Sequence, residues 1–178
     1  MGALADRLEH DATRGEVLDG PRRYLLMRAD VFSGAIALVA APLRAAMLEA
    51  FARSVALHGA DSVQAYLEAL HGDRDALIAS MPAAAADLGW GVWRFEPPAA
   101  PGDRLALTVD NSPFVQAFED SPADTAVCAP IAGMLTALGQ ALWQAPVQVR
   151  ETCCAARDGG TTCRFEARPR LPVPPPSP

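Results

Sequence analysis

The spacing of apolar side chains predicts that the first half of the chain is helical. Apolar residues recur at helical intervals over residues 31–57, and Pro42 is expected to divide this stretch into two helices, the second ending at Gly59. Two more helices are predicted, one over residues 61–70, whose first turn Asp61 can cap, and one over residues 73–88.

From residue 89 onward, apolar and polar residues alternate in short runs, which is typical of strands. The alternation predicts four strands, at residues 90–95, 105–109, 147–154 and 162–168, with the 97–103 region as the turn between the first two. A short helix over 113–118 and a long amphipathic helix over 125–143 separate the two strand pairs. This order predicts an α+β fold in which helices cover one face of an antiparallel sheet.

The two ends of the chain differ from this middle part. Residues 1–20 form a polar segment, interpreted as one short helix ending near Gly15 or Gly20. The apolar run at 24–27 fits either an edge strand or the approach to the next helix. Residues 169–178 contain six prolines and are expected to be a disordered tail. We therefore predict one ligand-binding domain over residues 21–168.

Length and charge exclude several classes of protein. A chain of 178 residues fits one domain. Its net charge of −6 and the absence of a basic stripe argue against nucleic-acid binding. The longest apolar stretch, residues 31–47, is interrupted by Gly34, Pro42 and Arg44, which argues against a membrane span. The first 19 residues lack the apolar core of a signal peptide, so we expect a cytoplasmic protein.

Four cysteines carry the clearest chemical signal. In a reducing compartment they indicate metal ligands or free thiols before disulfides. Cys153, Cys154 and Cys163 flank a loop rich in Asp and Gly, and Cys128 lies near the start of the preceding helix. Thiolates with one carboxylate, such as Glu151, suit tetrahedral Zn²⁺, and four protein ligands mark a structural site. The alternative is a cluster of buried thiols that pack as small apolar groups.

The choice of ligands stays open at this point. Neighbouring residues on a strand point to opposite faces, so Cys153 and Cys154 should not both face the metal. Glu151 and Cys154 also lie on opposite faces of an unbroken strand, so that pair requires the strand to turn near Cys154. Cys153 therefore competes with Glu151 or Cys154 as a ligand.

Two motifs resemble the 4-vinyl reductase domain family. They are Glu-x-x-Cys at 151–154, followed by a Gly-containing loop and Cys-Arg-Phe-Glu at 163–166, and Asn-Ser-Pro at 111–113 ahead of Cys128. Similar domains are the sensors of phenol- and xylene-responsive bacterial activators, and stand-alone members are associated with bacteriochlorophyll synthesis. The loop before Cys163 is longer than the family's pattern, and Cys153 is an additional thiol. The family's polar phenol-binding residues have no counterpart that we can place.

The resemblance implies several properties beyond those that spacing predicts. It implies a plait similar to that of vesicle-tethering subunits, a homodimer, and a pocket for a small hydrophobic or aromatic ligand. It also implies structural zinc held by Cys128, Glu151, Cys154 and Cys163.

Three aromatic residues, Trp90, Trp93 and Phe95, are the candidates for lining such a pocket. By alternation Trp93 and Phe95 share one strand face and Trp90 lies on the other. Their more ordinary interpretation is as core residues, which we favour. The sequence shows no nucleotide-binding motif and no catalytic constellation, so no catalytic residue is predicted.

Three functions fit these patterns. The first is a zinc-stabilised sensor or carrier domain for a hydrophobic or aromatic molecule. The second, which rests on the family's name, is an enzyme or accessory protein of tetrapyrrole vinyl reduction. The third is a dimeric interaction module that uses its dimer surface and its proline-rich end. The sequence favours binding over catalysis.

Overall fold

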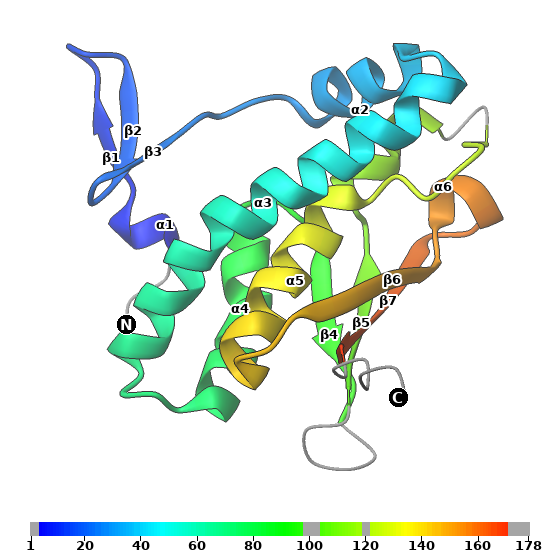
Figure 1. Ribbon diagram of the computed structural model, residues 1–178. Coiled ribbons are helices and arrows are strands. Elements are labelled where there is room, and N and C mark those ends of the chain that lie inside the picture. The colour runs from blue at the N-terminus through cyan, green and yellow to red at the C-terminus, as the bar shows by residue number, and fades with distance from the viewer. Residues whose placement is uncertain (1–3, 98–103, 119–121, 171–178) are drawn as a thin grey trace, which may run out of the picture.

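A four-stranded antiparallel sheet forms one layer of the computed structural model, which describes residues 4–97, 104–118 and 122–170 (Figure 1). The strands are β4 (Val92–Phe95), β5 (Leu105–Asp110), β6 (Val147–Cys153) and β7 (Thr162–Pro169). Their order is β4-β5-β7-β6, and every neighbouring pair is antiparallel. The predicted α+β fold with an antiparallel sheet is confirmed.

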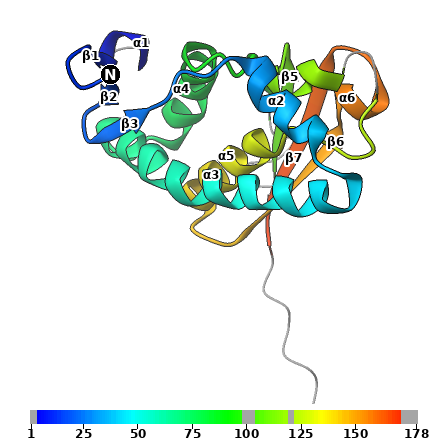
Figure 2. The same cartoon turned by 90° about the horizontal axis from the view of Figure 1, so that it is seen from above.

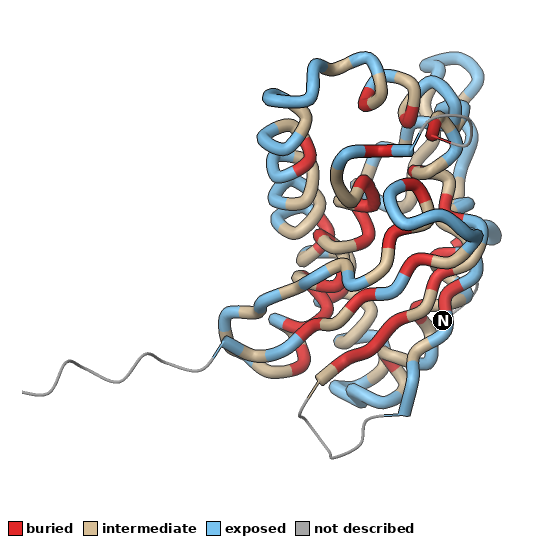
Figure 3. The backbone as a smooth tube through the Cα atoms, turned by 90° about the vertical axis from the view of Figure 1, so that its right-hand side faces the viewer, coloured by how far each residue is buried: buried red, intermediate tan, exposed pale blue. Residues whose placement is uncertain are grey.

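The alternation of residues along the strands decides which face of the sheet is covered. On β7, Cys163, Phe165 and Ala167 are buried, whereas Arg164 and Arg168 between and beyond them are exposed. Figure 3 shows the same change between buried and more exposed positions along the strands. Because side chains on a strand point alternately to its two faces, the sheet has one face in the core and one toward solvent.

Helices cover the buried face. They are α2 (Ala29–Leu38), α3 (Ala41–Ala69), α4 (Arg74–Asp87), α5 (Ala129–Trp143), the 3-10 helix η1 (Pro113–Phe118) and the short α6 (Ala155–Asp158). Helix α5 contacts β6 and β7 on one side and α3 on the other, and α4 packs on β4. Figures 1 and 2 show α5 between the long α3 and the sheet. Within the described residues, no helix is long and apolar enough to cross a membrane.

Helix α3 does not end at Gly59, so that prediction is wrong. One helix runs through the two segments predicted as residues 43–59 and 61–70. Gly59 is buried against α5, and a Cβ atom built on it would lie 3.2 Å from Cε of Met134. This glycine allows a close approach of two helices and does not terminate one. In the sequence, a glycine that ends a helix and a glycine at a contact between helices look the same.

Helix α5 begins four residues later than predicted, at Ala129. Cys128 occupies its N-cap position, and Pro130 lies in the first turn, where its missing N–H costs no hydrogen bond. Residues 125–128 instead run as an irregular segment that delivers Cys128 to the end of the sheet.

The polar N-terminal segment contains strands where one short helix was expected. After α1 (Leu4–Arg7), the strands β1 (Glu9–Asp11), β2 (Glu16–Asp19) and β3 (Arg22–Tyr24) form a separate antiparallel sheet. Gly15 and Gly20 have φ of 64° and 58°, so they serve the turns between strands and do not end a helix. The predicted boundary at residue 20 falls between β2 and β3, which are paired.

Two further predictions fall wholly or partly outside the described residues. Residues 98–103 of the expected 97–103 turn are not described, nor are residues 171–178 of the proline-rich tail. Pro169, at the start of that tail, is the last residue of β7.

Arg44 joins the end of α2 to the start of α3. Its guanidinium donates to the carbonyls of Ile36, Ala37 and Val39 at 3.0–3.3 Å and pairs with Asp124 at 2.5 Å. The side chain is 13% exposed. It therefore satisfies carbonyls that the end of α2 leaves without helical partners.

Replacing Arg44 with methionine is expected to lower the free energy of unfolding by about 2 kcal/mol, because several charge-assisted hydrogen bonds are lost together. Urea denaturation measures the change. Arg53→Met on the same helix is the matched control, since Arg53 is exposed and makes no hydrogen bond or ion pair with the described residues. Equal effects of the two substitutions would contradict the role assigned to Arg44.

Candidate metal centre and ligand cavity

Four elements bring Cys128, Glu151, Cys154 and Cys163 together. Cys128 is the N-cap of α5, Glu151 lies on β6, Cys154 is the N-cap of α6, and Cys163 lies on β7. Their potential ligand atoms all lie within 4.8 Å of one another. The three cysteines are at most 1% exposed. The structure thus groups the four residues that the family resemblance implies as ligands.

Strand β6 is irregular near Cys154, as it must be if Glu151 and Cys154 are to face the same metal ion. The register of β6 against β7 shifts between Glu151 and Cys153, and the chain enters α6 directly after Cys154. A shift of one residue reverses the face to which the following side chains point. Cys153 is left outside the group, with its Sγ 3.6 Å from the carbonyl oxygen of Thr162.

The spacing of two of the thiols fits a tetrahedral ion. Metal–sulfur bonds of about 2.3 Å give sulfur–sulfur edges of about 3.8 Å in a regular tetrahedron. The Sγ atoms of Cys128 and Cys163 are 3.6 Å apart. The backbone N–H of Cys128 donates to Oε2 of Glu151 at 3.2 Å. The other carboxylate oxygen of Glu151, Oε1, is buried without a hydrogen-bond partner, and a bound cation would supply the missing partner.

Charge also favours a cation in this group. Burial, followed by the charge of Cys154, raises the pKa of Glu151 to about 8. Hydrogen bonds to Cys154 and Cys163 raise the pKa of Cys128, and burial adds to the effect. Hydrogen bonds from Cys128 and Cys163 lower the pKa of Cys154. Crowding thus opposes several negative charges, and a divalent ion supplies the compensating positive charge.

A second layer of contacts holds the four side chains. Oγ of Ser112 lies 3.3 Å from Sγ of Cys128, and the backbone N–H of Ala155 donates to Sγ of Cys163 at 3.3 Å. The carboxylate of Asp158 accepts from the backbone N–H of Cys154 at 2.9 Å. Hydrogen bonds of this kind orient metal ligands. Sequence reasoning did not place Ser112 or Asp158 next to the cysteines, because their contacts arise only in the folded chain.

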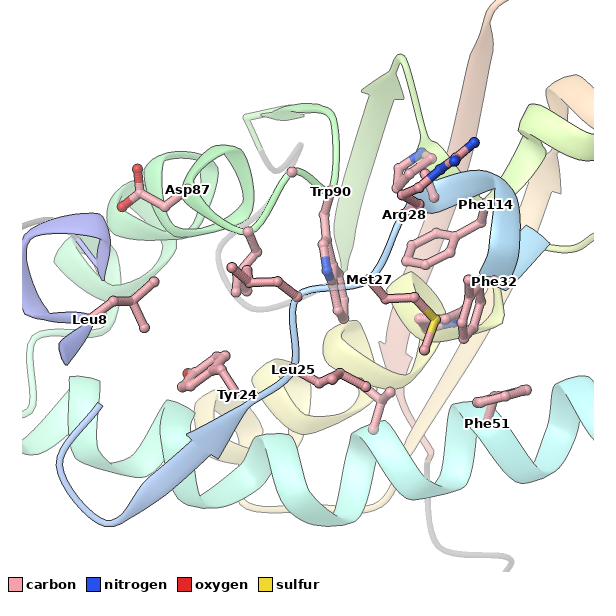
Figure 4. A pocket seen from close by; sticks show the side chains of 17 residues that line it. Leu8, Tyr24, Leu25, Met27, Arg28, Phe32, Phe51, Asp87, Trp90 and Phe114 are labelled. Atoms are coloured by element: carbon pink, nitrogen blue, oxygen red, sulfur yellow. The ribbon is translucent and has the colours of Figure 1, made fainter. Parts of the chain in front are cut away.

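An apolar cavity of about 620 Å³ opens on the other side of η1, between the segment that precedes α2 and the helices (Figure 4). Its aromatic wall is a chain of edge-to-face ring contacts. Phe32 lies 5.0 Å from Phe51 and 5.5 Å from Phe114, and Phe114 lies 5.4 Å from Trp90, measured between ring centroids. A volume of this size is typical of ligand sites.

The three aromatic candidates take different places. Trp90 precedes β4 and lines the large cavity. Trp93 is 3% exposed, belongs to the core, and donates from Nε1 to the carbonyl of Trp90 at 3.0 Å. Phe95 is half-buried and packs edge-on against Trp93 at 6.3 Å. Sequence reasoning missed Phe32, Phe51 and Phe114, whose positions on helices look like ordinary core positions.

The candidate metal centre and the cavity share a wall. Ser112, which contacts Cys128, also accepts a hydrogen bond from the backbone N–H of Phe114 at 3.4 Å. Pro130, two residues after Cys128, lines the cavity together with Phe114. Two short segments therefore connect the two sites, one from Ser112 to Phe114 and the other from Cys128 to Pro130.

The fold and these two sites define an α+β domain with a candidate metal clip beside an apolar cavity. No family model matches the chain, and no curated protein matches it. Among solved structures, it is similar to the crystal structure of the phenol-responsive sensory domain of the transcription activator PoxR with phenol. The TM-score is 0.74 at 18% identity, over 93% of this chain and 86% of that chain. At this identity the likeness establishes the fold.

Proposed function

We propose that this protein is a zinc-stabilised domain that binds a small hydrophobic or aromatic molecule, as a sensor or a carrier. The observation that carries the proposal is the shared wall. The contacts from Cys128 through Ser112 to Phe114 connect the candidate metal centre to the aromatic lining of the cavity. An ion bound at the centre would hold this wall in place.

Zinc suits the four side chains that would hold it. Three thiolates and one carboxylate are ligands that it accepts in tetrahedral geometry. Cys128, Glu151, Cys154 and Cys163 would fill all four positions, which leaves none for a substrate or a reactive water. The ion would therefore stabilise the fold, and we propose no catalytic role for it.

The chemistry of the cavity supports binding over catalysis. Its lining is largely aliphatic and aromatic, and its ionisable members are Tyr24, Arg28 and Asp87. Arg28 is paired with Asp30, and the carboxylate of Asp87 accepts from the backbone N–H of Ala5 at 3.2 Å. Among the residues that the structure describes, this lining holds no histidine, cysteine or serine that could form a nucleophile–base pair. The fold shared with a phenol-responsive sensory domain supports an aromatic ligand class.

We also propose a homodimer, as the family resemblance implies. The surface of α3 supports this, since Leu43 and Leu57 on that helix are 66% and 69% exposed. Sedimentation equilibrium of the zinc-loaded protein tests it, and a monomer at all concentrations would contradict it.

Ligand binding is tested by isothermal titration of the zinc-loaded protein with phenols and alkylbenzenes. Trp90→Leu is expected to weaken binding about tenfold, because an aromatic contact contributes about 1 kcal/mol beyond burial and leucine covers less of the ligand. Trp143→Leu is the matched control, since Trp143 is likewise half-buried but does not line the cavity. Absence of heat for these compounds and for larger aromatic molecules alike, with zinc bound, would contradict the proposed function.

A further inference from the structure

The segment at residues 25–28, between β3 and α2, exposes three consecutive large apolar side chains. Leu25, Leu26 and Met27 are 76%, 71% and 53% exposed. All three line the large cavity. Single apolar side chains on a surface are common, but a contiguous group marks a surface that something else covers.

Both ends of this segment are held by other parts of the fold. On its N-terminal side, Arg7 donates to Asp19 and to the hydroxyl of Tyr66 on α3, each at 3.0 Å. Arg22 of β3 donates to the carbonyl of Asp61 at 3.1 Å. On its C-terminal side α2 begins at Ala29. Figure 1 shows the segment running from the small sheet to α2 without pairing to a strand.

Most aromatic rings of the cavity gather toward one end, where Arg28 also lies (Figure 4). Figure 4 shows Phe32, Phe51 and Phe114 together near α2, with Trp90 in the middle. Tyr24 and Asp87 lie toward the opposite end, near Leu8. A ligand that fills this space is elongated and apolar along most of its length.

The volume separates large ligands from small ones. Cavities of roughly 300–1,000 Å³ hold drug-sized molecules, and a water molecule takes about 30 Å³. A single aromatic ring would leave most of the 620 Å³ to water against apolar walls. A single ring at the aromatic end could touch Met27, which lies beside Phe32, but it would leave the part of the cavity near Tyr24 and Leu8 unfilled (Figure 4).

We infer that the cavity takes an elongated molecule of several fused rings, which residues 25–28 close over, so that Leu25, Leu26 and Met27 pass from water onto the ligand. This inference rests on the proposed function and specifies its ligand class. Binding would thereby act on the small N-terminal sheet, because residues 25–28 join β3 to α2. The bound ligand would remove from water the apolar side chains that are exposed in the protein alone.

The test uses phenol, 1-naphthol and 1-pyrenol, which keep one hydroxyl while the number of rings rises. Affinity for the zinc-loaded protein, measured by isothermal titration, is expected to rise at least about tenfold from phenol to 1-pyrenol, because more apolar surface is buried. Binding of phenol as tight as that of 1-pyrenol would overturn the inference and leave the proposed function standing. Failure of all three to bind would contradict the proposed function itself.

Closure is tested separately from size. Leu26→Asp is expected to weaken 1-pyrenol binding at least about tenfold, because a charge would be buried against the ligand, and to change phenol binding little. Leu38→Asp is the control, since Leu38 is 90% exposed and does not line the cavity. Hydrogen exchange of amides 25–28 should slow only with 1-pyrenol bound. Slow exchange without ligand that depends on protein concentration would instead assign this surface to a second copy.

Discussion

Replacement of Cys163 with serine is expected to remove bound zinc and to lower the free energy of unfolding by more than about 3 kcal/mol. Structural zinc binding carries on the order of 10 kcal/mol of apparent free energy, part of which becomes folding free energy. Loss of the ion would also leave three crowded, buried groups, Cys128, Cys154 and Glu151, without the positive charge that compensates them. Metal content by elemental mass spectrometry and urea denaturation measure the two effects.

Cys153→Ser is the matched control for this substitution. Cys153 is adjacent to a candidate ligand, yet the bulge in β6 leaves it outside the group. We therefore expect it to retain zinc and to unfold at nearly the same urea concentration. Loss of zinc in Cys153→Ser but not in Cys154→Ser would show that the other thiol is the ligand. Full stability of Cys163→Ser without metal would contradict the structural role of the ion.

Replacement of Gly133 with alanine is expected to destabilise the protein by about 3 kcal/mol, because it forces α3 and α5 apart. A Cβ atom on Gly133 would lie 2.4 Å from the carbonyl oxygen of Ala52 and 2.9 Å from Cβ of Val55. Neither the backbone of α3 nor a β-branched side chain can move aside by rotation. Val55 also lines the cavity, so ligand affinity should fall as well.

Gly34→Ala provides the comparison within a helix. Gly34 lies in α2, and a Cβ atom there would meet no heavy atom within 4 Å. Alanine has the higher helix propensity, so Gly34→Ala should be neutral or stabilising by up to about 1 kcal/mol. Urea denaturation of both variants separates helix propensity from helix contact. Equal stability of the two variants would contradict the assigned contact at Gly133.

The strands and most helices could be predicted because their signals are local. Alternation over residues 105–109 and 162–168 depends only on which side of a strand faces the core. β7 follows it, and β5 departs from it only at Ala106, which is also buried. Helix α4 begins at Arg74, next to the predicted start at Asp73, whose side chain caps it by accepting from the backbone N–H of Ala76 at 3.0 Å. Pro42 separates α2 from α3 for an equally local reason.

Glycine was the residue whose meaning could not be predicted. Gly59 was expected to end a helix and lies inside one, where α5 packs against it. Gly15 and Gly20, predicted as alternative helix ends, lie instead in the turns of the small sheet. The polar sequence of residues 9–24 gave little indication of that sheet. A glycine permits several backbone shapes equally well, and only the neighbouring elements select one.

By itself the sequence determined the alternating strands, the helical first half, and a cluster of cysteines near Glu151 whose choice of ligands stayed open. Tertiary structure alone decided that a bulge in β6 turns Cys154 toward Glu151 and leaves Cys153 aside. It alone placed Phe32, Phe51, Phe114 and Trp90 around one cavity. The reason is distance along the chain. The periodicity of apolar residues shows on which face of a helix or strand a residue lies. A cavity forms where elements far apart in sequence pack together and leave space between their side chains, which periodicity does not show.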